Sequence, residues 1–163
     1  MGVATVDVER QSGRRGITGP SARQDRARRV LVKVELGTGG SAFLCGGLLA
    51  LRPDGSLLGL PTRVLVGAPF SDWRLPGLLL GGLVGVGYLG AGMWANARYP
   101  YSRELSVLAG VGLVVFEAVE WGWLGFHPLQ AVFMAVGAGV VRLAAVAGNP
   151  TTPGVFLAGT QGD

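Results

Sequence analysis

Long apolar runs without charge alternate with short charged segments along this chain. The longest run, residues 75–97, holds 23 residues and no charged side chain. A helix rises about 1.5 Å per residue, so this run covers roughly 30 Å or slightly more, the thickness of the bilayer hydrocarbon. Soluble domains of this size have no use for such a segment. The pattern therefore predicts an integral membrane protein.

Three further apolar runs predict membrane helices at residues 30–51, 105–125 and 128–147. The first of these is the weakest, because its uncharged part, 36–51, has only 16 residues and contains five glycines. It spans the bilayer if Lys33 reaches back to the headgroups and Glu35 finds a partner near that surface. The predicted fold class is all-α, a polytopic membrane protein built as a four-transmembrane-helix bundle.

The two ends of the chain differ in composition from the spans. Segment 1–29 is rich in Gly, Ser, Gln and Arg and lacks aromatic residues, which predicts a disordered basic tail. Segment 148–163 predicts a flexible C-terminal tail. Eight of the 14 basic residues lie within the first 33 positions: Arg10, Arg14, Arg15, Arg23, Arg26, Arg28, Arg29 and Lys33. By the positive-inside rule, we expect both termini and the 98–104 loop in the cytoplasm and the 52–74 connection outside.

Glycine and alanine recur at every fourth position on three of the predicted helices. The ridges are Gly77, Gly81 and Gly85; Ala42, Gly46 and Ala50; and Ala131, Ala135 and Gly139. Small residues let helix backbones approach closely in lipid, where van der Waals packing replaces the hydrophobic effect. We expect these ridges to pack inside the bundle, with homo-oligomerisation as the alternative. The expected neighbour of the Gly77 ridge is helix 105–125.

Two carboxylates interrupt the third span. Glu117 lies about 18 Å into a helix that spans roughly 30 Å, and Glu120 lies on the same face. A charged, lipid-facing carboxylate there costs at least about 2.5–3.5 kcal/mol, so Glu117 is predicted to face the interior or to be protonated. We expect a hydrogen-bonded structural role. A proton- or ligand-coupled role with His127 and Glu35 is the main alternative.

Composition excludes several classes of function. Cys45 is the only cysteine and His127 the only histidine, so no nucleophile–base set can be assembled and no metal site or cofactor is predicted. Enzymatic activity is not expected. The net charge of +4 resides mainly in the tail, where it favours anionic lipid headgroups as partners rather than nucleic acid.

The connection after the first helix carries a set of turn motifs that resembles a known family. These motifs are Glu35, Gly46-Gly47, Arg52-Pro53-Asp54-Gly55-Ser56, Leu58-Gly59-Leu60-Pro61, Ala68-Pro69-Phe70-Ser71-Asp72 and Leu75-Pro76-Gly77-Leu78. The chain resembles small bacterial four-helix membrane proteins whose first hairpin reads PxG…LGxP…PFxD…PGL. Gly125-Phe126-His127-Pro128-Leu129-Gln130 is similar to that family's turn before its last helix. The resemblance implies the same fold and topology, and it implies no activity.

The sequence thus predicts a multi-pass protein of the bacterial inner membrane. The expected function is that of a structural or accessory subunit, which uses its small-residue ridges to contact a membrane-protein partner or a second copy. Two alternatives stay open. One is a small proton-coupled transporter that uses Glu117 and Glu120, and the other is a quinone-linked redox protein, by loose analogy with other small four-helix membrane proteins.

Overall fold

The computed structural model describes residues 21–125 and 128–148, and all regular structure in this part of the chain is helical. Four helical segments are long and apolar enough to cross a membrane, which confirms the predicted all-α, four-helix fold class. The elements are α2 (Ala22–Leu51), the short 3₁₀ turns η1 (Ser56–Leu58) and η2 (Thr62–Leu65), α3 (Arg74–Leu78), the π-helical segment η3 (Leu79–Gly85), α4 (Val86–Asn96), α5 (Ser102–Leu124) and α6 (Pro128–Ala147).

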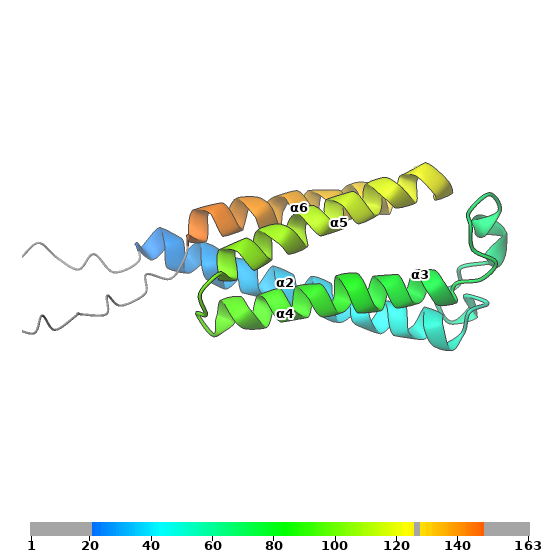
Figure 1. Ribbon diagram of the computed structural model, residues 1–163, viewed down its shortest axis with the longest axis horizontal. Coiled ribbons are helices and arrows are strands. Elements are labelled where there is room, and N and C mark those ends of the chain that lie inside the picture. Colours follow the sequence, from blue (N-terminus) through cyan, green and yellow to red (C-terminus); the bar gives the residue numbers. More distant parts are fainter. Residues whose placement is uncertain (1–20, 126–127, 149–163) are drawn as a thin grey trace, which may run out of the picture.

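The helices form two hairpins that pack side by side (Figure 1). The second span is the continuous rod α3–η3–α4, which packs against α2, while α5 packs against α6. Contacts of α2 with α6 and of α4 with α5 close the ring of four. The core contains Leu31, Ala42, Val84, Tyr88, Leu113, Val140 and Ala144. In Figure 1 the hairpins lie close together at the α4–α5 loop and diverge toward the connector, residues 52–73.

Helix α2 begins earlier than the sequence predicts. The composition predicts a tail through residue 29, but the helix starts at Ala22. The reason is a capping box: Ser21 accepts a hydrogen bond from the backbone of Gln24, whose side chain accepts one from the backbone of Ser21. Arg28 also ties this first part of α2 to α4, because its guanidinium donates to the carbonyl oxygen of Ala95 at 2.9 and 2.7 Å. The expected tail residues before position 21 lie outside the described residues.

The glycine ridge of the second span contacts α2, not α5. A Cβ atom on Gly77 would lie 2.7 Å from the carbonyl oxygen of Gly46, and one on Gly85 would lie 2.7 Å from the backbone nitrogen of Phe43. The prediction that helix 105–125 packs against the Gly77 ridge is therefore wrong. The connector joins α2 directly to α3, so α2 returns along the small-residue face of the next span, and its own Gly46 sits against Gly81.

The predicted packing role of Gly139 is also wrong. A Cβ atom at Gly139 would meet nothing within 4 Å, and Ala131 and Ala135 of the same ridge are exposed. Helix α6 instead uses Gly137, where an added Cβ would lie 2.7 Å from the carbonyl oxygen of Gly110 on α5. Positions 137 and 139 are two residues apart and so lie on different faces of the helix.

Candidate functional site

The sequence-predicted carboxylates Glu117 and Glu120 lie one turn apart on α5, near its connector end. Glu117 is 4% exposed and points into the bundle, while Glu120 is partly buried. The two carboxyl groups lie close enough to interact electrostatically. Gln130 at the start of α6 is a further buried polar side chain at this end. The structure therefore brings Glu117 and Glu120 together, as their spacing of three predicts.

An apolar cavity of about 180 Å³ lies beside Glu120. Its walls come from the connector, from the α3–η3 rod and from α5, where the two hairpins diverge. Three aromatic or proline rings of the lining, Phe70, Trp73 and Pro76, come from the connector and rod side, and two, Phe116 and Trp123, come from α5. The other apolar lining residues are Leu65, Ala68, Leu79, Leu83 and Val119. Glu120 is the one ionisable residue among these described lining residues.

The connector is held over this end of the bundle by its own turns. Gly55 adopts a positive φ of 73°, and an added Cβ there would meet the carbonyl oxygen of Leu60 and the ring of Trp73. The Trp73 backbone N–H donates to the carbonyl oxygen of Pro53 at 2.9 Å, which closes the loop. The Trp73 ring is buried against Leu49 and Leu65. These contacts fix one wall of the cavity.

Two aromatic rings join the connector to α5. Phe70 and Trp123 meet edge to face with ring centroids 5.6 Å apart. Buried Trp73 carries an indole N–H with no hydrogen-bond partner among the described residues. The surface of the cavity is almost wholly apolar, so Glu120 and Trp73 line it with their carbon atoms.

Asp54 at the start of the connector has a local role. Ser56 donates to the Asp54 carboxylate from its backbone N–H at 3.1 Å and from its hydroxyl at 2.8 Å. These two hydrogen bonds favour the charged form and lower the pKa of Asp54. The residue is an Asx-type turn former, and it takes no part in the cavity.

Glu35 belongs to a second, separate polar site. Its side chain is fully buried, and Ser106 of α5 and Tyr88 of α4 lie beside its carboxyl group. These oxygens do not complete hydrogen bonds: the two carboxylate oxygens of Glu35, the Tyr88 hydroxyl and the Ser106 hydroxyl have no partner within residues 21–125 and 128–148. Ser106 and Glu117 are eleven residues apart on α5, so about 16 Å of helix separates the two sites.

The remaining predicted residues do not join either site. His127 lies outside the described residues. Cys45 is a free, partly buried cysteine on α2. In the part of the chain that the structure describes, no three His, Cys, Asp or Glu side chains gather closely enough to hold a metal ion.

Sequence reasoning missed Tyr88 and Ser106 as neighbours of Glu35, and Trp73 as a residue of the cavity wall. Tyr88 had a readable signal, because it is the one tyrosine inside a predicted span. Trp73 had no such signal, and the structure buries it against Leu49 and Leu65. Its position depends on the fold of residues 52–73, which no periodic pattern encodes.

Comparison with known proteins gives no independent assignment: no family model, curated protein or solved structure matches this chain. The function must therefore be argued from the two polar sites and the cavity.

Proposed function

We propose that this membrane protein binds a small lipophilic molecule in the cavity beside Glu120. The observation that carries the proposal is the cavity itself, an apolar and aromatic space with Glu120 among its lining residues. Ligand sites are typically concave, mostly apolar and equipped with a few polar groups that orient the ligand. Carboxylates inside a membrane are costly, and those that persist there commonly mark functional sites.

The shape and chemistry of the walls favour a ring-bearing molecule. Trp73, Phe116 and Trp123 offer aromatic rings on an almost wholly apolar surface, and a rotation of the Glu120 side chain would bring its carboxyl group to a polar substituent. A quinone-like headgroup, with a flat ring and carbonyl oxygens, has this combination of features. The alternative of a quinone-linked role is thus the one with most support from the cavity.

The accessory-subunit role has less support. It was argued from three small-residue ridges that could contact a partner, yet Gly46, Gly77, Gly81 and Gly85 lie within the α2–rod contact. Of the three, the ridge of Ala131, Ala135 and Gly139 on α6 stays free for a partner among the described residues. Proton-coupled transport is also less favoured. The apolar side chains of Leu113, Val84 and Val140 occupy the core between the Glu35 site and the Glu117–Glu120 pair.

A pair of phenylalanine substitutions tests ligand binding. Val119 lines the cavity and Val115, one turn away, does not, although both are exposed to a similar degree. We expect organic extracts of purified wild-type protein and of Val115→Phe to contain one lipophilic compound at near-equal amount to protein, as measured by mass spectrometry. Extracts of Val119→Phe should contain at least tenfold less of this compound, because the larger side chain fills the cavity.

A direct titration makes the same test without a co-purified compound. Decylubiquinone added to the protein in nanodiscs should quench tryptophan fluorescence saturably, because Trp73 and Trp123 line the cavity. Glu120→Gln should weaken this binding about five- to tenfold through a changed hydrogen bond, whereas Glu117→Gln should leave it unchanged. Quenching that never saturates, together with equal extracts from both valine variants, would contradict the proposal. A stoichiometric protein partner after gentle extraction would then favour the accessory role.

A further inference from the structure

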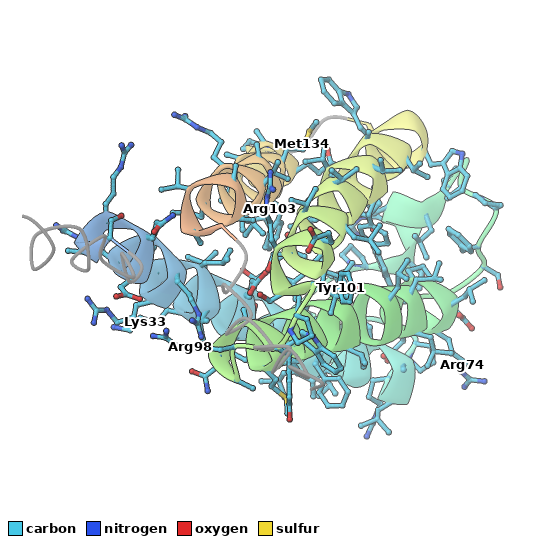
Figure 2. All side chains as sticks on the ribbon, turned by 60° about the vertical axis from the view of Figure 1, so that its left-hand side comes forward. Lys33, Arg74, Arg98, Tyr101, Arg103 and Met134 are labelled. Carbon is cyan, nitrogen blue, oxygen red and sulfur yellow. The ribbon has the colours of Figure 1, made fainter. Side chains whose placement is uncertain are left out.

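An open basic pocket lies at the opposite end of the bundle from the cavity. It has a volume of about 340 Å³ and lies between the first third of α2 and the α4–α5 loop. Four cationic side chains line it, Arg28, Arg29, Lys33 and Arg98, against a single carboxylate, Asp25. Figure 2 shows Lys33 and Arg98 near each other at this end, with Arg74 far from them. The pocket therefore carries an excess of three positive charges.

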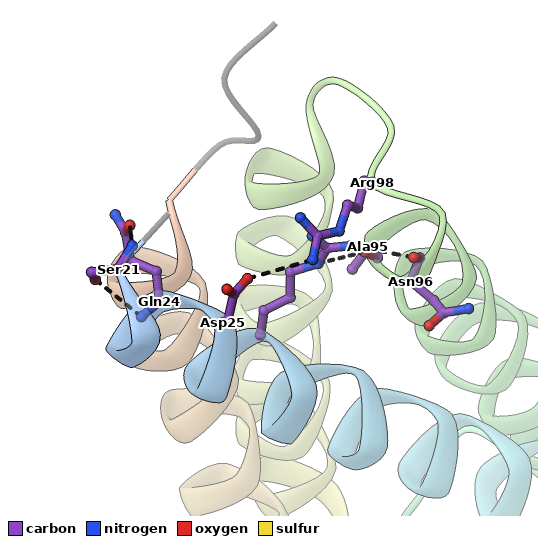
Figure 3. A network of polar contacts seen from close by, with 7 residues as sticks. Ser21, Gln24, Asp25, Ala95, Asn96 and Arg98 are labelled. Atoms are coloured by element: carbon purple, nitrogen blue, oxygen red, sulfur yellow. Dashed lines mark hydrogen bonds and ion pairs between the residues drawn. The ribbon is translucent and has the colours of Figure 1, made fainter. Parts of the chain in front are cut away.

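Two of these cations are fixed by contacts within the protein. Arg28 donates to the carbonyl oxygens of Ala95 and Asn96, which end α4 (Figure 3). Arg98 lies 3.4 Å from Asp25, and the same contact joins the loop to α2. The pocket thus has an ordered frame of α2 and loop residues.

Arg29 and Lys33 are the cations without such ties. Both are exposed, and they lie four residues apart, on one face of α2. Neither makes an ion pair within the residues that the structure describes. They can therefore turn toward an anion in the pocket without breaking a protein contact.

The pocket lies at the depth of the lipid headgroups. From Lys33 to Leu51, α2 has 19 residues, or roughly 28 Å of helix, about the thickness of the hydrocarbon layer. Asn96 at the other wall ends the second span, which is also about 30 Å long. An anion seated between Lys33, Arg29 and Arg98 is then level with the phosphates of the surrounding leaflet.

We infer that this basic pocket binds the phosphate group of an anionic lipid, such as phosphatidylglycerol or cardiolipin. The frame is contributed by both α2 and the α4–α5 loop, so the lipid bridges the two elements. Basic pockets between membrane helices bind anionic headgroups in this way. The inference is independent of the cavity beside Glu120.

The test compares lipid binding by paired charge variants. Dioleoyl phosphatidylglycerol is titrated into the detergent-solubilised protein, and bound lipid is counted by native mass spectrometry. Removal of two pocket cations in Arg29→Gln/Lys33→Gln should weaken binding roughly 25-fold, or about fivefold for each charge. Arg26→Gln/Arg103→Gln is the matched control, because both residues are exposed at the same end and neither lines the pocket. It should bind like wild type.

Three outcomes would overturn the inference. Equal losses in the two double variants would mean a diffuse surface attraction without a site. Equal binding of zwitterionic dioleoyl phosphatidylcholine would mean that the pocket does not select lipids by the net charge of the headgroup. Displacement of the lipid by 10 mM inorganic phosphate would assign the pocket to a soluble anion. Retained phosphatidylglycerol under that phosphate challenge supports the lipid.

Discussion

Glu35 is a carboxylic acid enclosed on all sides by the helices of the bundle. The sequence predicts it close to the headgroups, with a partner there. The structure buries it fully beside Tyr88 and Ser106, and leaves its oxygens without a completed hydrogen bond in the described part of the chain. An unpaired buried polar group costs about 1–3 kcal/mol. The fold therefore carries a cost at this residue that packing elsewhere must offset.

Substitution of Glu35 by methionine should stabilise the protein. Methionine has a similar length, fills the same space and needs no hydrogen bond, so the free energy of unfolding should rise by about 1–3 kcal/mol. Denaturation by sodium dodecyl sulfate in mixed micelles measures the change.

Leu31→Met is the matched control for this substitution. It lies one turn earlier on the same buried face, and its effect should stay below about 1.5 kcal/mol. A clear loss of stability in Glu35→Met alone would show that the carboxyl group contributes favourable interactions to the fold.

At the level of elements, the contact between α2 and the α3–η3–α4 rod depends on glycines, which have no side chain. An added Cβ at Gly46 would overlap backbone atoms of Gly77 and Gly81, whereas one at Gly47 would meet nothing within 4 Å. The rod changes from α- to π-helical hydrogen bonding over Leu79–Gly85. In this segment Gly81 and Gly85 face α2, and Leu79 and Leu83 face the cavity.

Alanine at Gly46 should separate the two helices, and alanine at Gly47 should not. We expect Gly46→Ala to lower the free energy of unfolding by about 1–3 kcal/mol, because backbone atoms must move apart. Gly47→Ala should be neutral or stabilising by up to about 1 kcal/mol, because alanine is the better helix former. The same micelle denaturation compares them. Equal effects of both substitutions would contradict the close approach at Gly46.

The sequence predicts the helices far better than their pairing. The absence of charged residues over 75–97 is enough to indicate a membrane span. Small residues recur at every fourth position on three helices, however, and the local sequence does not indicate which of these ridges packs against which. Gly46 and Gly81 meet because the connector joins their two helices directly in the chain. On α6 the same pattern was misleading, since nothing lies within 4 Å of an added Cβ at Gly139, whereas Gly137 packs against Gly110. The π-helical segment has no sequence period that marks it.

For the molecule as a whole, the described ends of the chain lie together. Gly148 lies near the side chain of Gln24, at the same end as the α4–α5 loop. Basic residues gather there, including Arg26, Arg29, Lys33 and Arg103. The connector end has a more even balance, with Arg52, Arg63 and Arg74 against Asp54 and Asp72. This asymmetry favours a cytoplasmic location for the basic end.

Single-cysteine labelling in intact cells checks that orientation. In a Cys45→Ala background, Ser56→Cys in the connector should react with a membrane-impermeant maleimide. Ser21→Cys should react only after the cells are permeabilised, because the positive-inside rule places it in the cytoplasm. The reverse pattern would contradict the predicted topology.

Only part of the candidate site could be predicted from the sequence. Glu117 and Glu120 follow from their position inside an apolar span, because charge in such a place is rare. The cavity beside Glu120 could not be foreseen, since its walls come from the connector, the rod and α5 and form only when the two hairpins diverge. The aromatic contact between Phe70 and Trp123 joins positions 53 residues apart.

The exposed rim of that cavity determines the route by which a ligand would reach it. Leu83 and Val119 line it and are exposed on the outer surface of their spans, at a depth where the surroundings are acyl chains. A guest molecule of the proposed kind would therefore arrive by lateral diffusion within the leaflet. Its occupancy would follow its mole fraction among the lipids and respond little to dilution of the surrounding water. Extra phospholipid, by contrast, would lower that mole fraction and empty the cavity.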